Sequence, residues 1–460
     1  MIFVGVDVGT TRIKAVAYDD TEGRAVAQAS VDTPVRQAEH GAVHEPLAMF
    51  DAVMSCLRGV SAECASRIAA ISVVSLAEEV VLVDRAGTPV FDGPVWYEPR
   101  GAGYVPEYVA LRGEAAAANP AFSLFTLRWI AERAADARTH AVRFTDMASF
   151  ALCRLAGRGD RLVMDHSHAS RTGAFALADR TFDAAALEWA GDWANLAPEL
   201  VPSGQVIGTL TPELASALGL GSDVQIVSGA HDHFAAAFAS GVRRAGDAML
   251  SAGTAEAQLV LTDTVPDAAG LPVDVGCFVD DTTYYAHRGL AAGQLFANWR
   301  TLLHAGGELR DAWFSPVPQR DRGTALPTCS IDPELATAGF TNLPLDVGPD
   351  DVLRCLSEGL AMCARDALAL LERATGTPVR QLTVAGPAAL HDGWQRLRAA
   401  ILQRDLRIVT TSEPSALGAA VLAQRAITGT ADVPTELIDV PAGAHDPYYA
   451  AMIDAYDRAH

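Results

Sequence analysis

The first nineteen residues predict a β-hairpin from the order of their apolar and polar positions. Residues 1–8 are mostly apolar and rich in valine, which is typical of a buried strand. A short turn follows at residues 9–11, and apolar residues then alternate with polar ones over residues 12–19. Because a period of two is the signature of a strand, we predict a strand, a turn and a second strand rather than a strand followed by a helix.

Helices and strands alternate along the rest of the chain. Helices are predicted where apolar residues recur every three or four positions, at residues 46–59, 121–157, 234–240, 350–374, 394–404 and 416–427. Strands are predicted at residues 71–74 and 80–84, which we expect to pair with each other, and at residues 224–228, 246–250, 258–261 and 381–385. Proline-rich stretches at residues 262–272 and 312–349 predict loops.

The opening pattern of strand, Gly-Thr turn and strand occurs a second time, around Gly253 and Thr254. A chain of 460 residues is long for one hydrophobic core, so two domains are the natural expectation. The repeated pattern therefore predicts two related α/β domains, which we place at residues 1–244 and 245–460.

Charge and cysteine content narrow the class of protein. The formal net charge of -21 disfavours nucleic acids and anionic membrane surfaces as partners, because lysine and arginine supply that affinity. The seven cysteines contain no C-x-x-C pair, so neither a disulfide framework nor a zinc site is predicted. The sequence has no basic signal segment and no apolar run of roughly 20 residues, so we expect a cytoplasmic protein without a membrane partner.

The first hairpin turn is a candidate phosphate site. Asp7 stands at a strand end, where a carboxylate can hold Mg²⁺ directly or through water, and Gly9 lets backbone N–H groups approach phosphate oxygens. The hydroxyls of Thr10 and Thr11 add donors, and Lys14 adds a cation. The alternative is an ordinary hairpin with Lys14 on a solvated face.

The second turn, at Gly253 and Thr254, offers the same chemistry in the other half of the chain, or an ordinary hairpin with hydroxyl-capped turns. Between the two turns, Asp232 follows a predicted buried strand and precedes a helix. Phosphoryl transfer to an alcohol needs a group that accepts the hydroxyl proton, and aspartate does this in several kinases. The alternative is that Asp232 only caps the helix. Since no third ligand lies near His231 and His233, substrate hydrogen bonding is favoured over a metal site.

Six segments in order resemble motifs of the FGGY carbohydrate kinase family: residues 7–14, 96–100, 165–172, 229–241, 251–254 and 413–420. The resemblance implies two RNase H-like domains of the actin-like ATPase superfamily, with ATP and a sugar in a catalytic cleft between them. It implies a sugar-binding N-terminal domain that carries the catalytic base, and a nucleotide-binding C-terminal domain. Members of the family are often dimers, so a homodimer is a further expectation.

The same resemblance assigns roles to single residues. Asp232 becomes the catalytic base, and Asp7 and Asp232 become the Mg²⁺ ligands. The nucleotide-binding set is Gly9, Thr10, Thr11, Lys14, Gly253, Thr254, Gly386, Ala388 and Gly418. The substrate-binding set is Glu78, Trp96, Glu98, Arg100, His231 and Asp232.

Two segments depart from the family pattern. Residues 385–389 keep one glycine, Gly386, of the glycine run expected near adenosine; Pro387 lacks an N–H donor and Ala388 adds a methyl group. Weak ATP binding, or a pseudokinase with a regulatory role, is the corresponding alternative. Glu78 stands where xylulose kinases carry a histidine and glycerol kinases a glutamate; its alternative is a solvent-facing charge at a strand start.

The predicted function is transfer of the ATP γ-phosphoryl group to a primary hydroxyl of a small neutral ketose or polyol, with a pentulose-like substrate favoured. A carboxylate at residue 78 can accept sugar hydroxyls and repels acidic substrates. A kinase for a tetritol or a glycerol-like polyol is the nearest alternative. An ATP-dependent chaperone or filament protein on the same fold is a third, although no substrate-binding appendage follows the last predicted helix.

Overall fold

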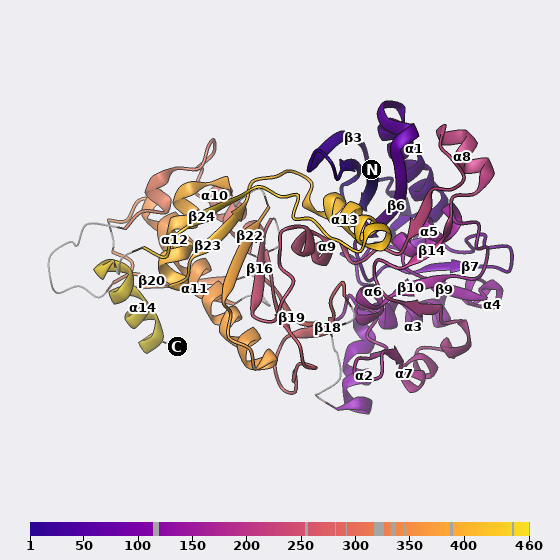
Figure 1. Cartoon of the computed structure of the whole chain (residues 1–460). Helices are drawn as coiled ribbons and strands as arrows, with labels where there is room; N and C mark the ends of the chain where they lie inside the picture. Colours follow the sequence, from indigo (N-terminus) through magenta and orange to yellow (C-terminus); the bar gives the residue numbers. More distant parts are fainter. Residues whose placement is uncertain are drawn as a thin grey trace. The chain divides into compact units, whose positions relative to one another are not determined.

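The structure, a computed structural model, describes every residue except 114–118, 254–255, 281, 291, 317–325, 333–336, 345, 387–389, 444–445 and 460. The chain divides into two compact units (Figure 1). Unit 1 consists of residues 1–243, 274–284 and 412–434, and unit 2 consists of residues 244–273, 285–411 and 435–460.

Unit 1 is built on a six-stranded sheet with the order β14-β15-β6-β1-β2-β3. The strands are β1 (Ile2–Val8), β2 (Arg12–Asp19), β3 (Arg24–Asp32), β6 (Ile68–Ser75), β14 (Val206–Thr209) and β15 (Gln225–Val227). β1 and β2 pair antiparallel from Ile2 opposite Asp19 to Val8 opposite Ile13, which confirms the predicted hairpin. β1, β6 and β15 run parallel, so their carboxyl ends meet at one edge of the sheet.

Successive side chains of a strand point to opposite faces, and those of β1 are buried in a separate core on each face. Val4 and Val6 belong to a core that also includes side chains of α1 (Pro46–Cys64) and α5 (Met147–Leu155). Phe3 belongs to a second core with side chains of α13 (Pro414–Thr428). This two-sided burial explains why the strand is apolar throughout rather than alternating.

Smaller elements of unit 1 surround this sheet. They are β4 (Arg36–Ala38), β5 (Gly41–His44), β7 (Val81–Val83), β8 (Gly93–Pro94), α2 (Val105–Arg112), α3 (Ser123–Arg133), α4 (Ala135–His140), β9 (Arg143–Thr145), β10 (Val163–Asp165), α6 (His166–Ser170), β11 (Phe175–Ala176), β12 (Thr181–Phe182), α7 (Ala184–Trp189), β13 (Glu199–Val201), α8 (Pro212–Leu218), α9 (Asp232–Ala239) and β18 (Asp274–Cys277).

Two predictions within unit 1 are wrong. Residues 121–157 are not helical throughout, because β9 separates α4 from α5. β7 pairs with β9, and β6 pairs with β1 and β15 instead of with β7. In both cases a strand finds its partner far away in the sequence, which a local pattern does not reveal.

Unit 2 repeats the strand order of unit 1. Six strands of a seven-stranded sheet run in the order β19-β17-β16-β22-β23-β24, with β16, β22 and β23 parallel and β17 antiparallel to β16. Their bounds are β16 (Asp247–Ala252), β17 (Glu256–Thr262), β19 (Tyr284–Leu290), β22 (Gln381–Ala385), β23 (Leu406–Val409) and β24 (Leu437–Val440). The repeated order confirms the predicted α/β class with two related sheets.

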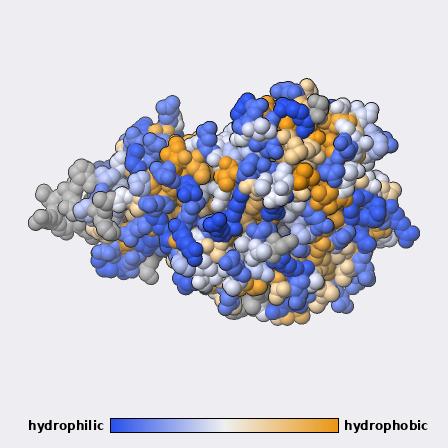
Figure 2. Space-filling view, in the orientation of Figure 1, coloured by the Kyte–Doolittle hydropathy of each residue, from blue (hydrophilic) through white to orange (hydrophobic). Residues whose placement is uncertain are grey.

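The other elements of unit 2 are α10 (Ala292–Leu302), β20 (Thr328–Asp332), β21 (Thr337–Thr341), α11 (Pro349–Thr375), α12 (Asp392–Leu402) and α14 (Pro447–Ala459). β20 and β21 form a hairpin inside residues 312–349, so that stretch is not a loop throughout. All seven cysteines are buried as free thiols. Among the described residues no helix has the length and apolar character to cross a membrane. The face in Figure 2 is largely hydrophilic, with apolar side chains in scattered patches.

Candidate active site

Asp7 is a buried carboxylate near the carboxyl end of β1. Its side chain is buried, and its Oδ1 atom has no hydrogen-bond partner among the residues that the structure describes. Burial raises the pKa of Asp7 well above its usual range, and the charge of Asp232 raises the pKa further, while Lys14 opposes both. Asp7 and Asp232 are therefore close enough to interact, and Lys14 only partly offsets burial and the negative charge around Asp7.

Asp232 is the first residue of α9 rather than its cap. The N-cap position belongs to His231, whose side chain makes no capping bond. The Asp232 Oδ1 accepts a hydrogen bond from the His233 N–H at 2.6 Å, and its side chain is 17% exposed. The His231 Nδ1 lies 3.4 Å from the same Oδ1, so the structure brings this predicted substrate residue to the predicted base. Asp232 thus lies at the positive end of a helix, with one edge open to solvent.

The turn between β1 and β2 is held by its own backbone and by Thr33, the residue that follows β3. The Gly9 N–H donates to the Arg12 carbonyl at 3.2 Å, and the Thr33 hydroxyl donates to the Gly9 carbonyl at 2.7 Å. The Thr10 hydroxyl accepts from the Trp96 Nε1–H at 3.0 Å. One residue predicted for phosphate and one predicted for substrate therefore touch each other, while the Thr11 side chain is exposed.

Two residues predicted to bind nucleotide already have structural partners. The Lys14 Nζ lies 2.5 Å from the Glu413 Oε2, just before α13. A Cβ atom on Gly418 would stand 2.1 Å from the carbonyl oxygen of Ala235, so α13 and α9 approach too closely for any other residue. Packing of the two helices is sufficient reason for a glycine at this position.

A network of three charges lies at the predicted substrate end. Glu78 Oε1 accepts from the Arg171 guanidinium at 2.7 Å, and Arg171 Nη1 also donates to Asp274 Oδ2 at 2.8 Å. Burial raises the pKa of Glu78, which Arg171 opposes, and the charge of Asp232 is among the further causes that raise it. Glu78 also has φ of 70°, an uncommon conformation for a residue with a side chain.

Arg171 and Asp274 were not predicted as site residues. They lie 103 positions apart in the sequence, so no local pattern joins them. The one available signal was Arg171 inside the resemblance at residues 165–172, where a cation next to a predicted carboxylate invites pairing. The solvent-facing alternative for Glu78 is wrong, because its side chain is only 7% exposed.

Glu98 and Arg100 hold the β5 hairpin. The Glu98 Oε2 accepts from the Ala42 N–H at 2.9 Å, and the Arg100 Nη2 donates to the Ala42 carbonyl at 2.8 Å. The Arg100 guanidinium also lies over the Trp129 ring, 5.4 Å from its centre. These contacts give both residues a structural role at β5, which local sequence did not suggest.

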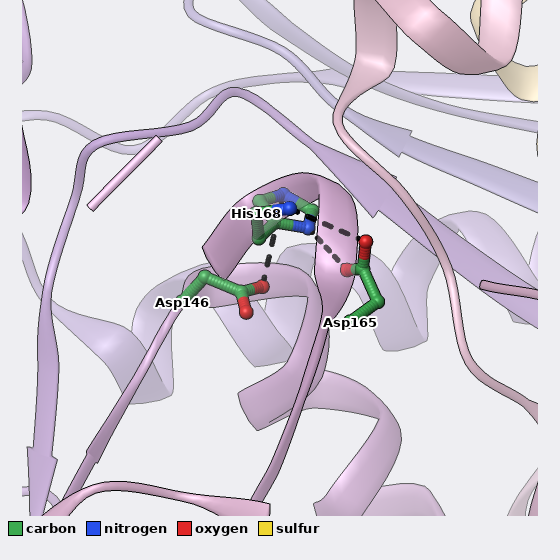
Figure 3. Close-up of side chains that lie close together, drawn as sticks. All are labelled: Asp146, Asp165 and His168. Carbon is green, nitrogen blue, oxygen red and sulfur yellow. Dashed lines mark hydrogen bonds and ion pairs between the residues drawn. The ribbon is translucent and has the colours of Figure 1, made fainter. Parts of the chain in front are cut away.

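A buried cluster of Asp146, Asp165 and His168 lies where α5 and α6 begin (Figure 3). It is the one group of three metal-binding side chains with suitable spacing among the described residues. The His168 Nδ1 lies 2.5 Å from the Asp165 Oδ2. Two ligand atoms on one tetrahedral Zn²⁺ would lie about 3.4 Å apart, so this pair leaves no room for an ion. We therefore interpret Asp165 and His168 as a buried ion pair within the protein and not as metal ligands.

Unit 2 carries the other predicted nucleotide residues. Gly253 follows β16 and Gly386 follows the neighbouring parallel strand β22. A Cβ on Gly386 would stand 2.5 Å from the Ala252 carbonyl oxygen, and its φ of 107° also requires glycine. Thr254 and Ala388 lie outside the described residues.

A buried ion pair follows the Gly253 turn within unit 2. Arg398 donates to the Glu256 carboxylate, and the Arg398 guanidinium lies 4.6 Å from the centre of the Trp394 ring. Burial raises the pKa of Glu256, although Arg398 opposes it. These three residues and Gly253 help to line a cavity of about 60 Å³ whose other lining residues are apolar or glycine.

Comparison with known proteins gives one consistent match. Residues 2–239 match the FGGY family of carbohydrate kinases, N-terminal domain, and residues 328–427 match its C-terminal domain. A curated glycerol kinase from Symbiobacterium thermophilum is 26% identical over 502 residues, covering 99% of this chain and 98% of its own.

Two solved structures share the fold over the whole chain. A xyloylose kinase from Brucella ovis has a TM-score of 0.89 at 21% identity, covering 100% of this chain and 98% of its own. A xylulose kinase from Rhodospirillum rubrum has a TM-score of 0.88 at 23% identity, with the same coverage. These similarities confirm the predicted fold of two RNase H-like domains of the actin-like ATPase type.

Proposed function

The chain belongs to the FGGY family of carbohydrate kinases, and we propose that it transfers the γ-phosphoryl group of ATP to a primary hydroxyl of a small neutral ketose or polyol. Kinases of this family are phosphotransferases that act on sugar or polyol hydroxyls. A pentulose-like acceptor is the favoured substrate. In this proposal the acceptor is bound by residues 1–244 together with Asp274 of unit 1, and residues 245–460 contribute most of the contacts to the nucleotide.

The observation that carries the proposal is the uncompensated charge of Asp7 and Asp232. The Asp7 Oδ1 is buried without a described hydrogen-bond partner, and each added negative charge raises the pKa of Asp7. Carboxylate oxygens are the ligands that Mg²⁺ prefers, so these two residues fit a magnesium ion. Bound there with ATP, Mg²⁺ would neutralise phosphate charge as the phosphoryl group is transferred.

Asp232 is proposed as the base of the reaction. Its carboxylate accepts the proton of the acceptor hydroxyl while that oxygen forms a bond to the γ-phosphorus and the bond to the β-phosphate oxygen of ATP breaks. The products are a phosphorylated acceptor and ADP. His231, 3.4 Å from Asp232, is positioned to hydrogen-bond the same hydroxyl.

The remaining predicted ligands divide between phosphate and acceptor. The Gly9 turn, with Thr10, Thr11 and Lys14, and the turn at Gly253 are proposed to bind phosphate oxygens through N–H, hydroxyl and ammonium donors. Glu78 and Trp96 are proposed to bind the acceptor.

The charges near Glu78 favour a neutral acceptor. Glu78 and Asp274 are each ion-paired with Arg171, which leaves one excess negative charge in this network before Asp232 is counted. A substrate carboxylate would therefore meet net repulsion, whereas hydroxyl groups can donate to the same oxygens.

A glycerol-like polyol or a tetritol is the second candidate acceptor. The curated relative quoted above is a glycerol kinase, and a carboxylate that accepts two hydroxyls suits a short polyol as well as a ketose. The two candidates differ in chain length and in the presence of a carbonyl group, so a substrate panel separates them.

The test is ADP production from ATP and Mg²⁺ over a panel of ketoses, polyols and sugar acids of three to six carbons. We expect stimulation by a neutral acceptor and none by the acids. Preference for an acid would contradict the charge argument, and ADP release that no acceptor stimulates would favour a nucleotide-binding pseudokinase.

The role of Asp232 is tested with Asp232→Asn, which keeps the shape and removes the base. Loss of a general base costs about 10²–10⁴-fold in rate, so we expect kcat to fall by that factor with the best acceptor. Arg36→Met, at a surface ion pair of unit 1, is the matched control for handling and stability. Full turnover in Asp232→Asn would refute the assignment.

A further inference from the structure

We infer that the buried pair of Asp165 and His168 is a positioning device for the base Asp232, to which it is connected through Ser167 and the backbone of His231. This inference rests on the proposed role of Asp232. His168 lies in α6 and Asp165 is the residue that caps this helix, and both side chains are buried (Figure 3).

The hydrogen bonds of His168 indicate a doubly protonated ring. Its Nδ1 lies 2.5 Å from the Asp165 Oδ2, and an ionised carboxylate only accepts. Its Nε2 lies 3.1 Å from the Ser75 Oγ, whose single proton is donated to the Leu76 carbonyl at 2.8 Å. This arrangement fits a ring in which both nitrogens donate, and we assign His168 as an imidazolium.

The surrounding charges agree with this state. The Asp146 Oδ1 lies 3.8 Å from the His168 Nε2, which places a second carboxylate against the ring. Burial opposes the charge on the ring, but Asp146 and Asp165 together raise the pKa of His168 to about 10, and Asp232 adds to this rise. Two carboxylates thus lie against the cation, and the centre of the His231 ring lies 6.2 Å from the centre of the His168 ring.

Ser167 links the ion pair to the catalytic loop. Its hydroxyl donates to the Asp165 Oδ1 at 2.5 Å and accepts the backbone N–H of His231 at 2.9 Å. His231 is the N-cap residue of α9, and Asp232 follows it directly. A shift of Asp165 would therefore move the start of the helix that carries the base.

The Asp165–His168 pair is also connected to the carboxyl end of β6. Ser75, the last residue of β6, receives the His168 Nε2–H and forms an isolated β-bridge with His231. Its N–H donates to the Ala230 carbonyl at 3.3 Å. One imidazolium thus holds both the strand end that leads to Glu78 and the loop that leads to Asp232.

Two buried serines provide a matched test. Ser167 and Ser203 both donate to the Asp165 Oδ1, at 2.5 and 3.1 Å, but only Ser167 also accepts the His231 N–H. Ser167→Ala therefore breaks the link to α9, whereas Ser203→Ala removes a hydrogen bond to the same oxygen and keeps the link.

We expect Ser167→Ala to lower kcat about tenfold with the best acceptor while the KM for ATP changes less than about twofold, because a small misplacement of a catalytic group is costly. Ser203→Ala should keep kcat within about twofold of the wild type. Amide hydrogen exchange at His231 should accelerate in Ser167→Ala and not in Ser203→Ala. Equal kcat and equal exchange in the two variants would overturn the inference.

The results of these variants distinguish failure of the positioning role from failure of the proposed function. If Asp232→Asn is inactive and Ser167→Ala behaves like Ser203→Ala, the positioning role fails and the base remains. If Asp232→Asn is fully active, the proposed base fails, and the positioning of a base fails with it. His168→Gln, which keeps a donor without the charge, should reproduce the loss of kcat; a wild-type kcat in this variant would also count against the inference.

Discussion

Two of the groups of buried carboxylates in unit 1 differ in how their charge is compensated. In the first, Asp165 pairs with the His168 imidazolium and accepts from two serine hydroxyls. In the second, the Asp7 Oδ1 meets no hydrogen-bond donor within the described part of the chain, and Asp232 adds a second negative charge. The first group touches the carboxyl end of β6 through Ser75, and the second includes Asp7 near the carboxyl end of the neighbouring strand β1.

The difference in compensation shifts the pKa values of Asp165 and Asp7 in opposite directions. Burial raises the pKa of both, but the charge and hydrogen bonds of His168 lower the pKa of Asp165 below its usual range. The pKa of Asp7 stays well above its usual range, because Lys14 only partly offsets burial and Asp232. A buried charge that the chain compensates belongs to the fold, whereas one that it leaves uncompensated is suited to a cationic ligand.

The largest expected effect is on the free energy of unfolding of Asp165→Asn. Breaking a buried ion pair leaves an uncompensated charge on His168, so we expect a loss of about 3–5 kcal/mol.

Asp7→Asn removes a charge without breaking a pair, so the stability of this variant should be unchanged or higher by about 1 kcal/mol. Its kcat should nevertheless fall at least about 100-fold, because a Mg²⁺ ligand is lost.

Urea unfolding of both variants measures this contrast. The control for the asparagine substitution is Asp92→Asn, whose carboxylate is partly exposed in a surface ion pair and should change stability by less than about 1 kcal/mol. If Asp7→Asn lost as much stability as Asp165→Asn, the carboxylate of Asp7 would belong to the fold, and the comparison would fail.

A smaller effect is expected in the pH dependence of stability. Histidine titrates near pH 6.5 in an unfolded chain, whereas the pKa of His168 in the folded protein is about 10. Between these values the unfolded chain releases a proton that the folded chain retains, so His168 stabilises fully below pH 6.5 and loses this effect as pH rises toward 10. The slope contributed by one proton is at most about 1.4 kcal/mol per pH unit.

The measurement is the difference in unfolding free energy between wild type and His168→Gln at pH values from 6 to 10. Contributions from other titrating groups largely cancel in this difference. We expect the difference to shrink steadily over this range. A constant difference would mean that His168 carries no charge in the folded protein, and the contrast between the two groups would lose its basis.

Local sequence patterns predicted the elements that carry Asp7 and Asp232, and one strand of unit 2. The β1–β2 hairpin, the helix after Asp232 and the strand at residues 381–385 follow from apolar periodicity and turn residues, which act over a few positions. The same reasoning placed the strand β7 but gave it the wrong partner, and it merged residues 121–157 into one helix. Both errors arise because β7 pairs with β9, which is distant in the sequence.

Local sequence patterns could not predict the Asp165–His168 group either, because its partners are also distant in the sequence. The imidazolium of His168 depends on Ser75, Asp146 and Asp165, which come from three separate segments. The pairing of Arg171 with Glu78 spans 93 positions. Sequence resemblance marked residues 165–172 as important, but only the three-dimensional arrangement assigns a protonation state and a set of partners to each side chain.

The smallest expected effect concerns Lys14, a cation that lowers the pKa of Asp7. Its pair with Glu413 is partly exposed, and such pairs contribute about 0.2–1 kcal/mol, so Lys14→Met should hardly change stability. If Lys14 also binds phosphate, the KM for ATP should rise about tenfold, the equivalent of one charge-assisted hydrogen bond. Arg36→Met, which breaks a surface pair with Glu45, is the control and should leave this KM unchanged. An equal KM in both variants, measured by ADP production, would mean that Lys14 serves Glu413 alone, and that its charge is internal compensation for the Asp7 group.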